Sequence, residues 1–257
     1  MKYTQKLLLA LLFVSITMFL TGCTAVKDVA SMTATERYDY AKSLYDNEDY
    51  YDAVKEFESL LLQYPASEIA DDAQYYLGMT RYNRGEYLIA AFEFSKLIRN
   101  MTGSDYVKEA QYMISDSYYK LSPHYALDQQ YTLKAIEEFQ AFIDFSPTDP
   151  KVAEAEAKIK ELNKKIAYKD FASAEIYEKM GYTLAALDYY KNVIDRYHDT
   201  EYAPESHYRR VQILLGKNRL SEALKDVNSY LSRYPEAPRV SEMQQLKTQI
   251  ESGLAKN

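Results

Sequence analysis

The chain has 257 residues and a formal net charge of −7, from 38 acidic and 31 basic side chains. An acidic chain without a basic stripe is a poor candidate for binding nucleic acid or an anionic lipid surface. Its single cysteine excludes an internal disulfide, and its few glycines and prolines, seven of each, favour helices.

The first segment is predicted to be a secretory signal over residues 1–22. Lys2 and Lys6 supply its positive start, and residues 7–20 are apolar apart from one serine and one threonine. A helix needs about 20 apolar residues to cross a bilayer, so this stretch is too short for a membrane span. Its length and its basic start are typical of a signal peptide that is cleaved during export.

The signal ends in Leu20-Thr21-Gly22-Cys23, which resembles the lipobox of bacterial lipoproteins. The resemblance implies lipid attachment at Cys23, with residues 23–33 as a lipidated linker. Two or more acyl chains hold a protein stably on a membrane. Thr24 stands where an inner-membrane retention signal favours aspartate, which implies the periplasmic face of the outer membrane. An ordinary signal peptide with a chance cysteine is the alternative.

Beyond the linker the sequence repeats itself. An alanine is followed four residues later by an aromatic residue or valine at Ala53 and Phe57, Ala90 and Phe94, Ala135 and Phe139, Ala186 and Tyr190, and Ala223 and Val227. Two of the intervals between successive alanines are 37 residues. Twelve residues before three of the alanines stands a small residue, at Ala41, Gly78 and Ala174. The pattern resembles tetratricopeptide repeats, in which each unit is a pair of antiparallel helices, A and B.

We therefore predict an all-α protein, a right-handed α-solenoid of five tetratricopeptide-like helix pairs with a C-terminal capping helix. The units are expected at residues 34–67, 71–103, 104–147, 167–200 and 204–237, with an insertion in the third near residues 121–130. One long linking helix is expected over residues 151–180, since this stretch has apolar periodicity and no proline or glycine. Residues 34–148 then hold repeats 1–3. Residues 149–257 hold the linking helix, repeats 4 and 5 and a capping helix near 239–254.

The A helices of the first three units carry a ladder of tyrosines. Each of these helices has two tyrosines seven residues apart, which places both on one helix face. On a tetratricopeptide scaffold these positions usually face the concave groove, and tyrosine combines a large contact area with a polar tip, which suits peptide recognition. The candidate groove residues are Tyr38, Lys42, Tyr45, Tyr75, Met79, Tyr82, Tyr112, Asp116 and Tyr119. The alternative is that the rings only pack the A helices together.

No residue pattern points to catalysis. The three histidines, His124, His198 and His207, lack the spacing of metal ligands, and there is no glycine-rich phosphate loop. Acidic residues beside Lys158, such as Glu154 and Glu161, are interpreted as a solvated helix face. We therefore expect a protein that is not an enzyme, with no metal and no cofactor.

The lipobox, the five units, the broken third unit and the long helix together resemble the BamD (YfiO) family of outer-membrane assembly lipoproteins. The stretches that carry the resemblance are YYDAVKEF at 50–57, YPAS at 64–67, ADDAQY at 70–75, LDQQ at 127–130 and YTLKAIEEF at 131–139. The resemblance implies a non-enzymatic scaffold subunit of the β-barrel assembly machinery. Its C-terminal repeats would bind the POTRA domains of a BamA-like insertase. Its N-terminal repeats would receive unfolded outer-membrane β-barrel proteins.

Two alternative functions remain open. One is another periplasmic tetratricopeptide lipoprotein that acts as an adaptor of envelope or peptidoglycan machinery, which a partner list would distinguish. The other is a surface glycan-binding helical-repeat lipoprotein. That function favours a deep pocket and insertions with exposed tryptophan, and this chain has no tryptophan.

Overall fold

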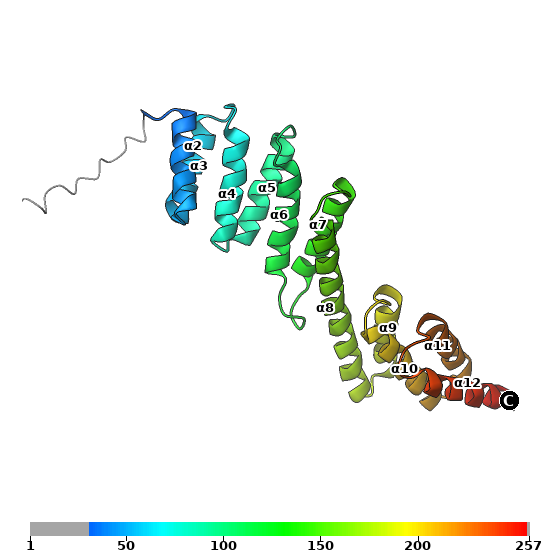
Figure 1. Cartoon of the computed structure of the whole chain (residues 1–257). Coiled ribbons are helices and arrows are strands. Elements are labelled where there is room, and N and C mark those ends of the chain that lie inside the picture. Colours follow the sequence, from blue (N-terminus) through cyan, green and yellow to red (C-terminus); the bar gives the residue numbers. More distant parts are fainter. Residues whose placement is uncertain (1–30, 256–257) are drawn as a thin grey trace, which may run out of the picture.

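The structure is a computed structural model that describes residues 31–255. The predicted signal peptide, the predicted lipid-attachment residue Cys23 and most of the predicted linker lie outside the described residues. The described part of the chain is an elongated stack of helices, with its two ends far apart (Figure 1).

The helices follow one another with short connections. They are α2 (Ala34–Asp46), α3 (Tyr50–Gln63), α4 (Ala70–Asn83), α5 (Tyr87–Asn100), α6 (Val107–Leu121), α7 (Gln130–Phe145), α8 (Val152–Lys179), α9 (Thr183–Arg196), α10 (Tyr202–Gly216), α11 (Leu220–Arg233) and α12 (Val240–Leu254). None of the helices between residues 31 and 255 combines the length and the apolar character that crossing a bilayer requires.

Successive helices pack as antiparallel pairs. The pairs are α2 with α3, α4 with α5, α6 with α7, the C-terminal part of α8 with α9, and α10 with α11, and α12 packs on α11 at the end of the stack (Figure 1). The predicted all-α solenoid of five helix pairs with a final helix is therefore confirmed. We number the pairs as units one to five and keep A and B for the first and second helix of each.

The turn from helix A to helix B is tight in four of the units. Each of these turns contains one residue with a positive φ, namely Glu48 at 63°, Gly85 at 76°, Gly181 at 78° and Asn218 at 55°. Glycine adopts this conformation without steric cost, which explains Gly85 and Gly181. The third unit instead has a longer connection. The side-chain amide of Gln129 closes it by donating hydrogen bonds to the carbonyl oxygens of His124 and Leu127, both at 3.0 Å.

In units one to four, a small residue of helix A faces a larger side chain of helix B. Gly78 is the tightest case, because a Cβ placed there would lie 2.6 Å from the ring of Phe94. Ser115 holds the corresponding place in the third unit and is fully buried. The repeat spacing does not reveal Ser115, because the insertion near residues 121–130 lengthens the distance between the two helices of the third unit. Helix pairing therefore depends on a close approach at the same point of four of the units.

The long helix α8 joins the two halves of the solenoid, where the sequence predicts a helix over residues 151–180. Near its N-terminus, Ala155 belongs to the core that contains Phe139 and Phe142. Near its C-terminus, Phe171 and Ala174 belong to the core of the fourth unit. One end of α8 therefore covers the third unit, and the other end is helix A of the fourth.

Replacing Gly78 with alanine is expected to destabilise the protein. The added methyl group would meet a Phe94 ring that is fully buried and enclosed by the core. Overpacking of this kind costs about 1–3 kcal/mol, which outweighs a gain in helix propensity of about 1 kcal/mol. Urea unfolding followed by circular dichroism measures the change. Gly103→Ala is the control, since no atom lies within 4 Å of the Cβ that it adds. Equal stability of the two variants would contradict the close approach.

Candidate peptide-binding groove

The predicted groove residues lie on the three neighbouring A helices α2, α4 and α6. Their exposure differs. Tyr75 and Tyr112 are only 9% and 5% exposed, and Asp116 is 7% exposed. The partly exposed members are Tyr38, Lys42, Tyr45, Met79, Tyr82 and Tyr119. The structure does not arrange the six rings as an open row, and contacts between successive A helices run through members of the set, such as Tyr82 with Asp116, and through residues outside it, such as Tyr76.

Tyr75 and Tyr112 belong to the core. The ring of Tyr75 stacks on Tyr106, with their centroids 4.2 Å apart. The ring of Tyr112 is flanked by Phe139 at 5.9 Å and Phe142 at 5.3 Å. The expectation that these two rings line an open groove is not met, because neighbouring side chains cover them.

Tyr76, which the repeat pattern does not single out, connects the first two units. Its ring centroid lies 5.3 Å from that of Tyr45 and 6.2 Å from those of Tyr38 and Phe57. The ammonium group of Lys42 lies 4.9 Å from the same centroid. The corresponding positions of the neighbouring units hold no aromatic residue, so repetition gave no signal for this one.

The accessible part of the ladder lies at the junction of units one and two. The side-chain amide of Asn83 donates to the hydroxyl of Tyr45 at 3.2 Å, and Lys42 pairs with Asp46 at 2.5 Å. Burial raises the pKa of Tyr45 above its ordinary value. Half-exposed tyrosine edges beside a lysine can contact an apolar or aromatic peptide segment.

A polar network connects α4, α6 and α8. The hydroxyl of Tyr82 donates to Asp116, and Lys158 donates to Asp116 at 2.5 Å and to the hydroxyl of Tyr112 at 2.9 Å. Lys158 also pairs with Glu154 at 2.9 Å. Burial alone would lower the pKa of Lys158, but its hydrogen bonds to Asp116, Glu154 and Tyr112 raise it above its usual range. Burial, with the hydrogen bond to Glu154, raises the pKa of Tyr112 to about 12.

The interpretation of Lys158 as part of a solvated face is therefore wrong. Its side chain is only 18% exposed, because it reaches from α8 across to α6. Tyr119 makes a similar connection, since its hydroxyl donates to Glu161 at 2.8 Å. The predicted groove residues of the third unit, Tyr112, Asp116 and Tyr119, therefore attach α8 to α6. A lysine outside the repeats carried no periodic signal that could have revealed this contact.

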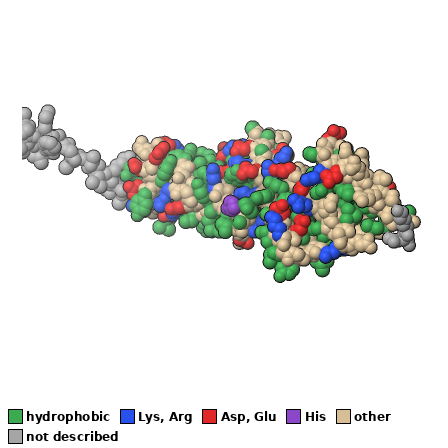
Figure 2. All heavy atoms as spheres, turned by 90° about the horizontal axis from the view of Figure 1, so that it is seen from below, with side chains coloured by type: hydrophobic (Ala, Val, Ile, Leu, Met, Phe, Trp, Pro, Cys, Tyr) green, Lys and Arg blue, Asp and Glu red, His purple; other side chains and the backbone are tan. Residues whose placement is uncertain are grey.

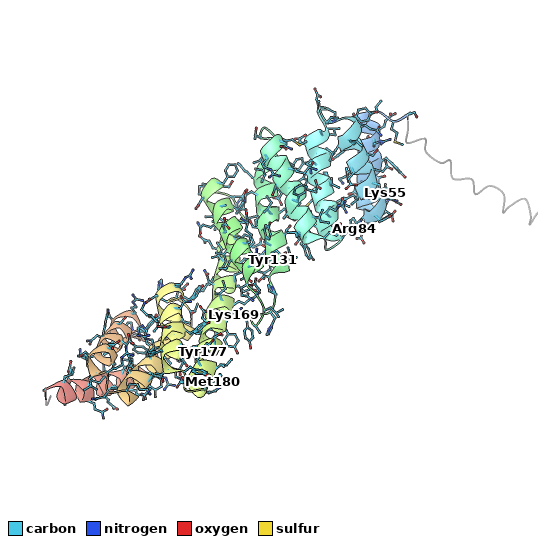
Figure 3. All side chains as sticks on the ribbon, turned by 180° about the vertical axis from the view of Figure 1, so that it is seen from behind. Lys55, Arg84, Tyr131, Lys169, Tyr177 and Met180 are labelled. Atoms are coloured by element: carbon cyan, nitrogen blue, oxygen red, sulfur yellow. The ribbon has the colours of Figure 1, made fainter. Side chains whose placement is uncertain are left out.

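Exposed apolar side chains gather on a different surface, the edge formed by the turns between A and B helices. We call the following set the turn edge: Tyr51, Leu88, Ile89, Phe92, Leu127, Tyr131, Leu133, Ile176, Met180, Tyr182 and Leu184, which are 36–72% exposed. Figure 3 shows Tyr131 and Met180 on this edge, and Lys55, Arg84 and Lys169 lie along the same side of the stack. Seen from the side of the turns, hydrophobic patches lie between charged groups (Figure 2).

Comparison with known proteins assigns the chain to a protein family. The YfiO family, described as outer membrane lipoproteins, matches residues 30–214. The chain belongs to the YfiO family. It is similar to the outer membrane protein assembly factor BamD of Rickettsia prowazekii, with 27% identity over 237 residues, 91% of this chain and 93% of the relative.

Two further similarities are partial or structural. A BamD of Caulobacter vibrioides is 33% identical over 88 residues, which cover 34% of this chain and 29% of that protein. A solved tetratricopeptide repeat protein of Bacteroides fragilis is 14% identical and has a TM-score of 0.45, covering 86% of this chain and 99% of that one.

This YfiO-family chain shows no metal centre in the part that the structure describes. No group of three or more histidine, cysteine, aspartate or glutamate residues within 31–255 is arranged to hold a metal ion.

Replacing Lys158 with methionine is expected to destabilise the protein by about 2 kcal/mol, because Asp116 would remain buried without its cation. Removing both charges in Lys158→Met/Asp116→Leu should cost less than the single change. Thermal unfolding in low salt measures both. Lys160→Met, an exposed change on the same helix, is the control. A loss of stability that matches the control would show that the network does not attach α8.

Proposed function

We propose that this YfiO-family protein is a non-enzymatic scaffold subunit of the machinery that assembles β-barrel proteins in the outer membrane. The family match over residues 30–214 carries the proposal. Similarity to the Rickettsia assembly factor along 91% of the chain supports it, because that similarity extends over both halves of the solenoid.

The N-terminal half would receive unfolded outer-membrane β-barrel proteins. The accessible junction of units one and two offers Tyr38, Tyr45 and Lys42 to an extended apolar segment with aromatic side chains. Met79, Tyr82 and Tyr119 extend the candidate surface towards α8. Tyrosine suits this task because its ring contributes contact area at low entropic cost, while its hydroxyl tolerates water.

The C-terminal half would dock on the POTRA domains of a BamA-like insertase. The two halves are separated by α8, whose 28 residues form one helix without proline or glycine. At about 1.5 Å per residue the helix is roughly 42 Å long, so it holds two binding surfaces apart as a stiff spacer. A subunit of this shape can deliver a chain from one surface to a partner on the other.

The lipid predicted at Cys23 would keep both surfaces at the periplasmic face of the outer membrane. Tethering raises the effective concentration of the scaffold near a membrane-embedded partner without any new contact. Mass spectrometry of the mature N-terminus tests the anchor, with a diacylated and N-acylated Cys23 as the expected species.

A photo-crosslinking residue at Tyr45 tests the receiving surface. We expect adducts with unfolded outer-membrane β-barrel proteins when the full-length lipidated protein is expressed in cells. Leu62 on α3 is the control position, because it is 82% exposed and lies outside the ladder. Adducts at Leu62 but not at Tyr45 would remove the groove from the proposal.

Affinity purification of the lipidated protein from membranes tests the docking partner. The expected partner is an outer-membrane barrel that carries POTRA domains. Recovery of peptidoglycan enzymes alone would favour the envelope adaptor, and recovery of surface glycan transporters would favour the glycan-binding lipoprotein. Either result would overturn the assembly role even if the Tyr45 adducts formed.

A further inference from the structure

One polar position recurs in all five units, immediately before an aromatic residue of helix A, which is Tyr38, Tyr75, Tyr112, Phe171 or Tyr208. In the first four units its side chain bonds to helix B of the same unit. Arg37 donates to Ser59, Gln74 donates to Glu93 at 2.9 Å, Gln111 donates to Glu138 at 3.0 Å, and Asp170 accepts from Asn192. The position therefore normally fastens helix A to helix B through a polar contact.

His207 holds this position in the fifth unit and breaks the rule. Its side chain is only 1% exposed, and neither ring nitrogen has a hydrogen-bond partner within residues 31–255. Asp226, which corresponds to the acids used by Gln74 and Gln111, accepts instead from Arg210 at 2.8 Å. Buried polar groups without a partner are rare in native proteins and call for a ligand, an ion or a water.

The ring of His207 lines a cavity of about 500 Å³ between α9, α10 and α11. Its wall holds three ion pairs, and within each pair the two charges cancel. The pairs are Lys191 with Asp195, Arg210 with Asp226, and Arg219 with Glu222. Lys225, Arg233 and Asp188 also line the cavity and make no ion pair within the described chain. The wall therefore carries one spare positive charge.

Several hydrogen-bond donors line the same space. Arg210 donates through Nε to Asp226 and through Nη1 to the carbonyl oxygen of Leu187 at 2.6 Å, and its Nη2 has no partner within residues 31–255. Burial, together with the charges of Arg210 and Arg233, lowers the pKa of His207 to about 4. The imidazole is then neutral at ordinary pH and offers one N–H donor.

We propose that this cavity binds the carboxylate of an aspartate or glutamate side chain of a partner protein, which Arg210 and Arg233 pair with and His207 hydrogen-bonds. A singly charged group matches the spare charge of the wall, whereas the wall's own carboxylates would repel a dianion such as phosphate. Leu184 at the rim is 72% exposed and also lines a neighbouring apolar hollow beside Tyr182. The acidic residue is therefore expected to have an apolar neighbour in its chain.

Nuclear magnetic resonance of the full chain in detergent, with labelled histidine, tests this site directly. The probes are the capped dipeptide acetyl-Leu-Glu-amide, its neutral counterpart acetyl-Leu-Gln-amide, and inorganic phosphate at matched ionic strength. We expect only the glutamate probe to shift the ring signals of His207 in a saturable manner. The exposed His124 and His198 should not respond. A bound carboxylate stabilises the imidazolium, so the pKa of His207 should rise from about 4.

Arg233→Gln supplies the matched variant, because Arg233 is exposed and its removal leaves the core intact. We expect it to weaken the glutamate probe by roughly tenfold, the loss of one charged hydrogen bond. Lys217→Gln removes an equal charge from the same unit outside the cavity and should have less than a twofold effect.

Three results would overturn the assignment. The first is that the glutamate probe leaves the ring signals of His207 unshifted, which would leave the cavity to water. The second and third are that the glutamine probe, or phosphate, shifts these signals as much as the glutamate probe does. The test uses isolated probes, so it succeeds or fails independently of which protein docks on the C-terminal half.

Discussion

The close approach of helix A to helix B is the constraint on which the rest of the structure depends. A residue as small as glycine, alanine or serine on helix A lets a large ring of helix B fill the space beside it, as Phe94 does against Gly78. In the fifth unit both members change, since the fully buried Val211 and Val227 stand where the other units have a small residue and an aromatic ring. The volume of the pair is conserved although its two residues are not, which is how close-packed cores tolerate substitution.

Once the pairs are fixed, the exposed side of each A helix must meet the next A helix. Tyrosine is suited to that junction, because its ring fills the gap and its hydroxyl reaches an acid on a neighbouring helix of the stack. Tyr106 donates to Asp72 at 3.0 Å, and Tyr119 reaches Glu161 on α8. Phenylalanine would fill the same space but would not make these hydrogen bonds. Much of the tyrosine in this chain thus has a structural cause, whichever ligand the remaining exposed rings contact.

The sequence predicted what repeats and failed where the chain departs from repetition. The spacing of Ala53 and Ala90 was enough to predict helix pairs, since a period of this length is typical of stacked helical units. The same regularity could place Tyr75 on a helix face but could not show that Tyr106, outside the ladder, covers it. Lys158 and Tyr76 have no counterparts in other units, so only the tertiary structure reveals their roles.

The departures from the repeat give the fifth unit a surface that differs from that of the other four. Units one to four carry the apolar turn edge, whereas α10, α11 and α12 add no large hydrophobic side chain to the exposed set described for residues 31–255. A polar cavity lies between the fourth and fifth units instead, where Asp226 pairs with Arg210 and leaves His207 without its usual contact. One end of the solenoid thus offers rings and aliphatic groups, and the other offers fixed cationic donors. Because α8 is one unbroken helix anchored at both ends by buried contacts, a partner bound at one surface is held at a defined distance from the other.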